Sequence, residues 1–225
     1  MKELIKDNRT YFIFLLSFAV LGGVYLFYLQ KGDDILFFNV YRKPLPNYCF
    51  RFATKMGEPP VYLLFGIAGL FYKFRYSLLI ALTGFIVLGV SFGLKTFFAM
   101  DRPVAFFDKL KRIAEVTLVE GVDIHSGPTS FPSGHTMSAF AIYSLLIFLL
   151  PKKTVIAVSL FLTALLVGIS RVFLVQHFWE DVYAGALIGS ALAIVIYLVQ
   201  AQFKEQPARW FDRPVFTAGK KGNAA

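Results

Sequence analysis

The stretch PSGHTMSAFAIYSLLIFLL, residues 132–150, joins a short polar block to an apolar run long enough to form a helix. Two further polar blocks adjoin apolar runs in the same way: Lys95-x6-Arg102-Pro103, and Ser170-Arg171-x5-His177-x3-Asp181. Together the three blocks hold three fixed cations, two histidines and a carboxylate in a chain that is otherwise mostly apolar. This pattern predicts an all-α fold in which polar residues gather at the ends of apolar helices.

The composition is typical of an integral membrane protein. Of 225 residues, 57% are hydrophobic and 16% are charged, and the mean hydropathy is +0.62, whereas a soluble domain usually carries about 25% charged residues. The charges gather between the apolar runs, as they do in membrane proteins. The net charge of +9 does not indicate nucleic-acid binding, because the basic residues form no stripe or arm. The single cysteine, Cys49, excludes an intrachain disulfide.

Six apolar segments are predicted to cross the membrane as helices of one bundle: 11–30, 59–73, 77–98, 135–150, 153–173 and 182–200. The first is long enough to span a bilayer, and no small-x-small cleavage site follows it, so an uncleaved span is expected rather than a signal peptide. Glycines four residues apart, Gly89 with Gly93 and Gly185 with Gly189, allow close helix contact in the third and sixth spans. No repeat or linker divides the chain, so residues 1–225 are expected to form a single domain.

Counting the spans puts all three polar blocks on one side of the membrane. Lys95 and Arg102 end the third span, His135 opens the fourth, and the block from Arg171 to Asp181 joins the fifth and sixth. Both termini then lie on the opposite side. Incidental polar residues would have no reason to share a side, so the arrangement predicts a single site.

Basic residues predict which side is cytoplasmic. The loops and the C-terminal segment on the side of the termini carry Lys73, Arg75, Lys152, Lys153, Lys204, Arg209 and Arg213. Because short loops weigh most in the positive-inside rule, the termini are expected in the cytoplasm and the polar blocks on the outer face.

Two segments lie outside the spans. Residues 31–58 mix aromatic side chains with basic ones such as Arg51 and Lys55, which suits a helix at the membrane surface. Residues 100–131 contain more basic residues and then a turn-forming run that begins at His125. We expect both segments to serve as packing elements and His125 to be an ordinary loop residue.

The first block brings two cations to one helix face. Lys95 and Arg102 are seven residues apart, so they share a face while the helix continues. Pro103 biases Arg102 away from helical geometry, so the helix is expected to finish near there. A lysine in this position often only extends to the membrane surface, but the two cations together can hold one anionic group.

The second block has the composition of a helix start. Ser133 suits an N-cap position, and the free N–H groups of a helix N-terminus also bind anions. Gly134 permits close approach of the backbone, and His135 can exchange a proton near neutral pH. A helix cap and a phosphate cradle are therefore compatible here.

The third block pairs an arginine with a histidine and a carboxylate. Arg171 can hold two oxygens of one phosphate. His177 and Asp181 are four residues apart, so on one helical turn the carboxylate can reach the imidazole, orient it and stabilise positive charge on it. Arg171 and His177 are six residues apart and would not share a helix face, so a break between them is expected.

The three blocks resemble the three-part signature of the type 2 phosphatidic acid phosphatase superfamily: Lys-x6-Arg-Pro, Pro-Ser-Gly-His and Ser-Arg-x5-His-x3-Asp. All eleven fixed positions match, in the family's order, within residues 95–181. The resemblance implies an integral membrane lipid phosphatase that needs neither a metal nor a cofactor. The sequence also contains no cluster of carboxylates suited to a two-metal site.

The same resemblance implies a role for each matched residue. His177 would attack phosphorus and form a phosphohistidine, with Asp181 orienting and activating it. His135 would protonate the leaving oxygen and then assist the attack of water. The other residues would bind the phosphate oxygens: Lys95, Arg102, Ser133, Gly134 and Arg171.

The resemblance leaves several substrates and two other activities open. The substrates are phosphatidic acid, phosphatidylglycerophosphate, undecaprenyl diphosphate or a lipid A type anchor, with headgroup selection expected in residues 31–58 and 104–131. The compact chain without an apparent targeting signal favours the last two, in a bacterial inner membrane.

Two other activities also remain open. A lipid phosphotransferase would use the same nucleophile, and a non-catalytic lipid-binding protein would keep only the fold. The superfamily also contains vanadium haloperoxidases, which are large soluble proteins. This short chain consists mostly of apolar spans, so a haloperoxidase is not expected. The sequence does not predict an oligomeric state.

Overall fold

The computed structural model describes residues 1–150, 154–203 and 210–216, and within them it has helices and no β-strand. The all-α prediction is therefore confirmed. The helices in chain order are α1 (Lys2–Asp7), α2 (Arg9–Tyr28), α3 (Asp33–Phe37), η1 (Asn39–Tyr41), α4 (Pro44–Lys55), α5 (Pro59–Leu70), α6 (Phe74–Phe98), α7 (Pro103–Lys109), η2 (Ile113–Glu115), α8 (Gly134–Leu149), α9 (Thr154–Phe173), α10 (Trp179–Ala201) and η3 (Trp210–Asp212).

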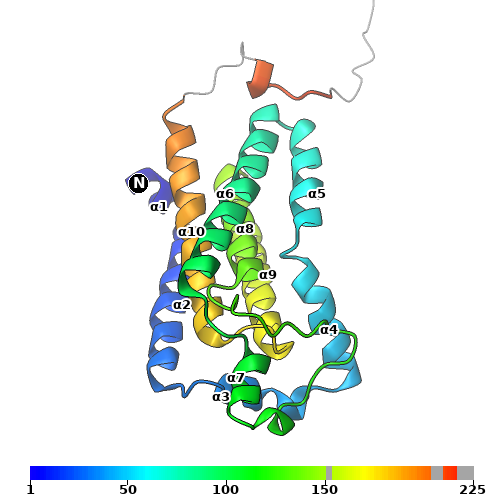
Figure 1. Cartoon of the computed structure of the whole chain (residues 1–225). Helices are drawn as coiled ribbons and strands as arrows, with labels where there is room; N and C mark the ends of the chain where they lie inside the picture. The colour runs from blue at the N-terminus through cyan, green and yellow to red at the C-terminus, as the bar shows by residue number, and fades with distance from the viewer. Residues whose placement is uncertain (151–153, 204–209, 217–225) are drawn as a thin grey trace, which may run out of the picture.

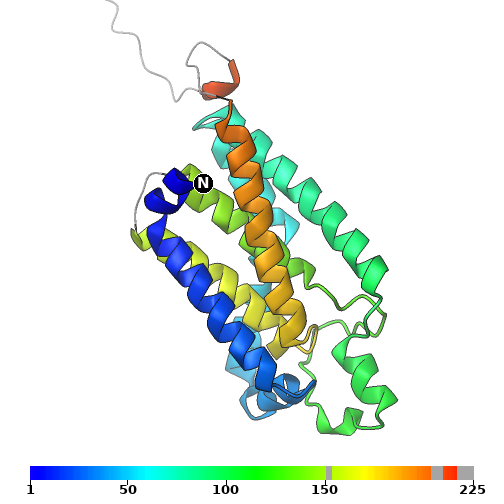
Figure 2. The same ribbon diagram turned by 90° about the vertical axis from the view of Figure 1, so that its left-hand side faces the viewer.

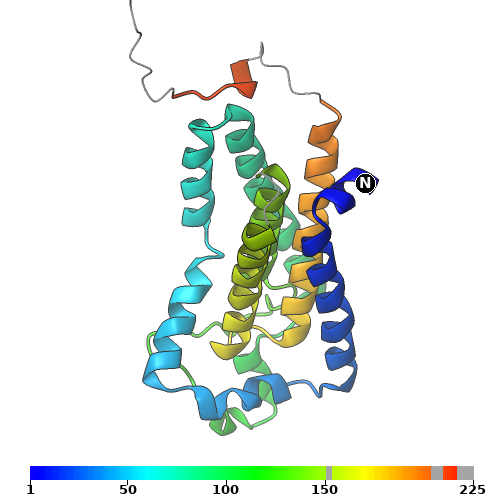
Figure 3. The same cartoon turned by 180° about the vertical axis from the view of Figure 1, so that it is seen from behind.

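Helix α8 is the centre of the bundle. It packs against α6, α9 and α10, and it stands behind α6 in Figure 1 and in front in Figure 3. Twelve of its sixteen residues are buried, among them Phe140, Ile142 and Leu145. Figure 2 shows α10 between α2 and α6, so α10 covers one side of the central helix. A helix that is apolar on all faces is expected to be surrounded in this way.

Two glycines of α10 allow it to approach α8 closely. A Cβ atom at Gly185 would lie 2.7 Å from the carbonyl oxygen of Ser133, and one at Gly189 would lie 2.3 Å from that of Met137. The predicted close contact is thus confirmed for α10. For α6 it is wrong, because a Cβ at Gly89 or Gly93 would meet nothing within 4 Å. Those two glycines lie on the exposed face of α6, where no helix among the described residues approaches.

The helices expose apolar side chains as membrane spans do. Four of them, α2, α6, α9 and α10, are long and apolar enough to cross a membrane. Leu21 of α2 and Phe92 of α6 are 69% and 72% exposed, which suits contact with lipid. Helices also form at the other two predicted spans, but α5 has 12 residues and α8 has 16. At 1.5 Å per residue both are shorter than the ~30 Å hydrocarbon core.

The three polar blocks emerge at one end of the bundle. Figure 1 shows α3 and α7 at this end, whereas the N-terminus and η3 lie towards the other end. Helix α6 ends at Phe98, four residues before Arg102, because Ala99 adopts a left-handed conformation (φ 45°). Pro103 instead begins α7. The expected break before His177 is confirmed, since α9 ends at Phe173.

At the end of the bundle near η3, one basic residue is internally paired. The Arg75 guanidinium donates hydrogen bonds to both carboxylate oxygens of Asp212 in η3, and its Nη2 lies 3.0 Å from Oδ2. Arg75 therefore links α6 to the C-terminal segment through a buried ion pair. Other residues used to predict the orientation and the fifth span lie outside the described residues: Lys152, Lys153, Lys204 and Arg209.

Candidate active site

Backbone and side-chain hydrogen bonds join the three polar blocks. The Ser133 N–H donates to the carbonyl oxygen of Asp181 at 3.0 Å, and the Ser130 N–H donates to that of Met100 at 3.0 Å. Arg102 Nη1 donates to the side-chain Oε1 of Gln176 at 3.2 Å. Residues from the end of α6, the start of α8 and the α9–α10 loop thus lie together at one end of the bundle, where the sequence predicts a single site.

His177 and Asp181 form a buried pair at the centre of this site. His177 Nδ1 lies 3.3 Å from Asp181 Oδ2, and the two residues are 1% and 0% exposed. The same carboxylate oxygen accepts the Phe178 N–H at 2.9 Å and the hydroxyl of Ser130. His177 lies two residues before α10 rather than within it, so the contact forms because Asp181 faces back across the helix start.

The other nitrogen of His177, Nε2, makes no hydrogen bond to the part of the chain that the structure describes. Burial lowers the pKa of His177 well below 6.5, and the nearby positive charges of Arg171, Arg102 and Lys95 lower it further. The imidazole is consequently neutral at physiological pH. A neutral ring with one nitrogen fixed by a carboxylate has the lone pair that a nucleophile requires.

Three cations surround this pair. Lys95 Nζ donates to the Thr129 carbonyl oxygen, and Arg102 Nε donates to the Thr129 hydroxyl at 3.1 Å. Arg171 is 7% exposed, and its Nη1 donates to Thr54 Oγ1 at 2.6 Å. Its Nε is buried without a partner in the described chain. An unpartnered buried guanidinium donor suits a site that receives an anion.

The start of α8 lies beside these cations. A Cβ atom at Gly134 would lie 3.0 Å from Ser91 Oγ and 3.8 Å from Lys95 Cε. Ser133 is the N-cap, as predicted, but its side chain makes no capping hydrogen bond. Its hydroxyl accepts instead from Thr136 Oγ1 at 2.9 Å, so the first N–H groups of α8 remain available to a ligand.

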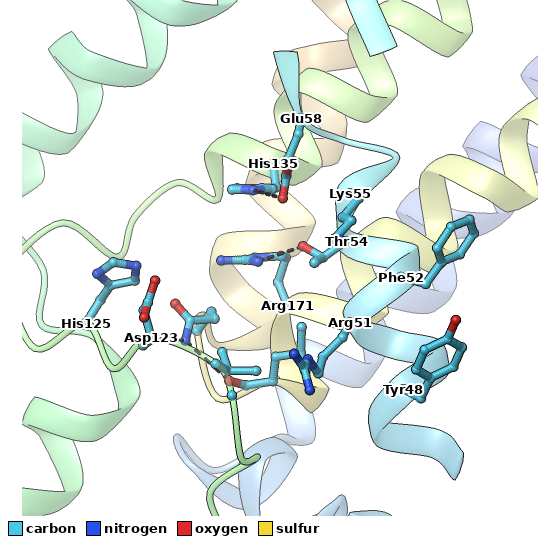
Figure 4. Close-up of a pocket in the computed structure, with 14 residues that line it drawn as sticks. Tyr48, Arg51, Phe52, Thr54, Lys55, Glu58, Asp123, His125, His135 and Arg171 are labelled. Atoms are coloured by element: carbon cyan, nitrogen blue, oxygen red, sulfur yellow. Dashed lines mark hydrogen bonds and ion pairs between the residues drawn. The ribbon is translucent and has the colours of Figure 1, made fainter. Parts of the chain in front are cut away.

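His135 lies on the open side of the site. Its Nε2 is 3.8 Å from Glu58 Oε1, and its side chain is 34% exposed. Figure 4 shows the ring of His135 beside Glu58, with Arg171 and Thr54 below them. A carboxylate at this distance can help to hold the orientation of the imidazole ring.

Several residues that complete the site are not in the three blocks. Ser130 and Gln176 lie next to or inside a block, so their positions in the sequence were a usable signal. Thr54 and Glu58 come from the end of α4 and the start of α5 and had no such signal. His125, expected to be an ordinary loop residue, lines a cavity beside the site.

Two hollows meet at His135. A polar cavity of about 650 Å³ lies between α4, the 121–125 loop and the site, and its walls include His135 and Arg171. An apolar groove of about 700 Å³ lies between α5, α6 and α8 and reaches Gly134 and His135. Glu58 also lines both hollows. Within the described residues no group of three or more His, Cys, Asp or Glu side chains could hold a metal ion.

Comparison with known proteins gives a family and several relatives. The model of the PAP2 superfamily matches residues 72–205. Lipid phosphate phosphatase 1 of Arabidopsis thaliana is 39% identical over 90 residues, which are 35% of this chain and 28% of that protein. Phosphatidylglycerophosphatase B of Bacillus subtilis is 36% identical over 81 residues, 32% of this chain and 40% of that protein. The match thus spans less than half of either relative.

Two solved structures are similar over most of their length. Aquifex aeolicus LpxE aligns with a TM-score of 0.58 and 28% identity, over 73% of this chain and 92% of that one. The transmembrane PAP2-type phosphatidylglycerolphosphate phosphatase of Bacillus subtilis aligns with a TM-score of 0.51 and 25% identity, over 90% and 99%. The family model covers more than half of the chain and contains all three polar blocks. The chain therefore belongs to the PAP2 superfamily.

Proposed function

We propose that this protein is a membrane lipid phosphatase that cleaves a phosphomonoester or diphosphate through a phosphohistidine, without a metal ion. The observation that carries the proposal is the buried imidazole of His177, held by Asp181 at 3.3 Å. Burial lowers its pKa, and the three neighbouring cations lower it further. A fixed nucleophile among positive charges meets the main demands of phosphoryl transfer, which are positioning and charge stabilisation.

In the first step, His177 Nε2 attacks phosphorus and the bond to the leaving oxygen breaks. The imidazole becomes positively charged, and Asp181 stabilises that charge through Nδ1–H. His135 donates its proton to the leaving oxygen. Lys95, Arg102 and Arg171 bind the phosphoryl oxygens, on which negative charge is concentrated.

In the second step, water attacks the phosphohistidine. His135 removes a proton from the water, the bond between phosphorus and Nε2 breaks, and orthophosphate is released. His177 returns to its neutral form and His135 to its protonated form. The Glu58 carboxylate, 3.8 Å from His135 Nε2, is close enough to hold the ring in position for both proton transfers.

The apolar groove supports a lipid as the substrate. It is lined by side chains such as Leu63, Ile67 and Phe85 and ends at Gly134 and His135. A hydrocarbon chain in this groove would keep its apolar surface out of water while the phosphate entered the polar site. The exposed apolar side chains of α2 and α6 support a position of the groove within a bilayer.

We further propose a bacterial inner membrane, with the termini in the cytoplasm and the active site on the outer face. Support comes from Lys73 and Arg213, which belong to the side of the termini. Short loops on the cytoplasmic side of a membrane are enriched in basic residues.

The test is release of orthophosphate by detergent-purified protein from a panel of lipid mono- and diphosphates, with a chelator present. His177→Ala should lower turnover by about a thousandfold or more, since removal of a nucleophile abolishes the covalent route. Lys109→Gln, which changes an exposed lysine of α7, is the control and should keep wild-type activity.

Rapid quenching with 32P-labelled lipid should trap an acid-labile phosphoprotein in the wild type and none in His177→Ala. Full turnover by His177→Ala would contradict the assignment of the nucleophile. Activity that disappears with the chelator and returns with magnesium would contradict the metal-free mechanism. Transfer of label to an added lipid alcohol, without orthophosphate, would identify a phosphotransferase.

A further inference from the structure

The polar cavity beside the site extends well beyond the residues of the three blocks. One wall holds His135 and Arg171, and the facing wall is formed by α4 and the 121–125 loop. Figure 4 shows Arg51 and Lys55 of α4 on the opposite side of the cavity from His125. A volume of about 650 Å³ lies within the range of sites that bind small ligands or headgroups.

We infer that Arg51 and Lys55 form a second anion subsite, which binds a second phosphate carried by the leaving group of the substrate. This inference rests on the proposed function and narrows its substrate class to lipids that carry two phosphates. Arg51 and Lys55 are four positions apart, which is about one helical turn, so their side chains share a face of α4. Both residues line the cavity.

Most N–H donors of these two cations have no hydrogen-bond partner in the described chain. Lys55 makes no hydrogen bond or ion pair with the described chain. Arg51 makes a single long hydrogen bond, from Nη1 to the Glu120 carbonyl oxygen at 3.4 Å, although a guanidinium has five N–H donors. Arg51 is nevertheless positioned, because a Cβ atom at Gly121 would lie 3.0 Å from both of its terminal nitrogens.

The balance of charges in the cavity favours an anion. Its lining contains three cations, Arg51, Lys55 and Arg171, and two carboxylates, Glu58 and Asp123. Glu58 is the carboxylate that faces His135 at 3.8 Å. A phosphate between Arg51 and Lys55 would therefore gain two cationic partners.

The second phosphate is assigned to the leaving group because His135 adjoins both hollows. In the proposed mechanism His135 protonates the leaving oxygen, and the apolar groove takes the hydrocarbon chain. The cavity then receives the polar part of the lipid that links the cleaved phosphate to that chain. Phosphatidic acid has no charge there, whereas a lipid diphosphate or phosphatidylglycerophosphate has a second phosphate.

The first test compares phosphatidic acid with diacylglycerol diphosphate of the same acyl chains. We expect kcat/KM of the wild type to favour the diphosphate by about tenfold or more, mostly through KM. Arg51→Gln/Lys55→Gln should bring this ratio close to one. Lys43→Gln/Lys111→Gln removes two exposed positive charges that do not line the cavity and should keep the wild-type ratio. An unchanged ratio in Arg51→Gln/Lys55→Gln would overturn the inference.

The second test does not depend on turnover. Methylenediphosphonate and methylphosphonate are soluble, non-hydrolysable probes whose binding can be measured by calorimetry in a neutral detergent without lipid. The wild type should bind methylenediphosphonate about tenfold more tightly than methylphosphonate, and Arg51→Gln/Lys55→Gln should lose this difference. Equal binding by the two proteins would overturn the subsite. If the wild type cleaves no lipid, the proposed function fails, while this comparison still decides the subsite.

The phosphate that binds here could instead come from surrounding bilayer lipids. In that case the effect of Arg51→Gln/Lys55→Gln would appear only when phosphatidylglycerol is added to the micelles. It would also be the same for the mono- and the diphosphate substrate. This result would overturn the assignment to the leaving group.

Discussion

Asp34 is a buried carboxylate that holds the start of α10. Its Oδ2 accepts the Trp179 N–H at 2.6 Å, it is 3% exposed, and its Oδ1 is buried without a partner in the described chain. Trp179 directly follows the loop that carries His177. Burial raises the pKa of Asp34 to about 6. A residue outside the three blocks thus anchors the helix that supplies Asp181.

This raised pKa predicts a pH-dependent stability. The folded protein holds the Asp34 proton more tightly than the unfolded chain does, so the wild type should lose stability as pH rises from about 4 to about 6. The loss is about 3 kcal/mol. Asp34→Asn keeps a carbonyl oxygen for the Trp179 N–H and does not titrate. The free energy of unfolding of this variant, relative to that of the wild type, should therefore increase as pH rises across this window.

Thermal unfolding in detergent between about pH 4 and about pH 7 measures this change. The matched control is Asp33→Asn, which changes the exposed neighbour. Parallel stability curves for the wild type and Asp34→Asn would show that the Asp34 carboxyl titrates alike in the folded and unfolded states.

At the scale of elements, the contact of α10 with α8 depends on Gly189. Because a Cβ at this position would lie 2.3 Å from the Met137 carbonyl oxygen, Gly189→Ala should push the helices apart and destabilise the protein by about 1–3 kcal/mol. Gly89→Ala, in the open face of α6, should be neutral or stabilise by up to about 1 kcal/mol. Melting temperatures of both variants in detergent test this difference, and equal melting temperatures would contradict it.

The positions of the helices could be predicted from the sequence, but their contacts could not. Runs of apolar residues mark the spans, because burial in lipid requires them. The pairs Gly89–Gly93 and Gly185–Gly189 have the same spacing, yet only the second meets another helix. Spacing describes one helix face and carries no information on whether lipid or protein covers it. The end of α6 at the C-cap residue Ala99, before Pro103, could not be predicted either. Alanine rarely adopts a left-handed conformation, so its presence in the sequence does not indicate a helix end.

The same distinction applies to the candidate site. The residues of the three blocks could be predicted because they carry charge or titratable groups in a chain with few of them. Thr54 and Arg51 could not, since they reach the site only through the packing of α4 against α9. A polar residue in a surface helix has the same appearance in the sequence whether it faces solvent or a cavity.

For the whole molecule, the proposed orientation can be tested on intact bacterial cells. With Cys49→Ser as the background, Lys109→Cys puts the only thiol in α7, at the end that holds the site, and Glu3→Cys puts it in α1 near the N-terminus. A membrane-impermeant maleimide should label Lys109→Cys directly and Glu3→Cys only after the membrane is permeabilised. The reverse pattern would place the site in the cytoplasm.

His135 adjoins both the apolar groove and the polar cavity, so in the proposed reaction the two products of one turnover would depart into different phases. The dephosphorylated lipid would diffuse away within the plane of the bilayer, and orthophosphate would escape into water. The rate should then follow the mole fraction of substrate in the surface rather than its amount per volume. Inert lipid would lower the rate by diluting the substrate in the surface. The enzyme would thus meet its substrate within the membrane plane and release its inorganic product perpendicular to that plane.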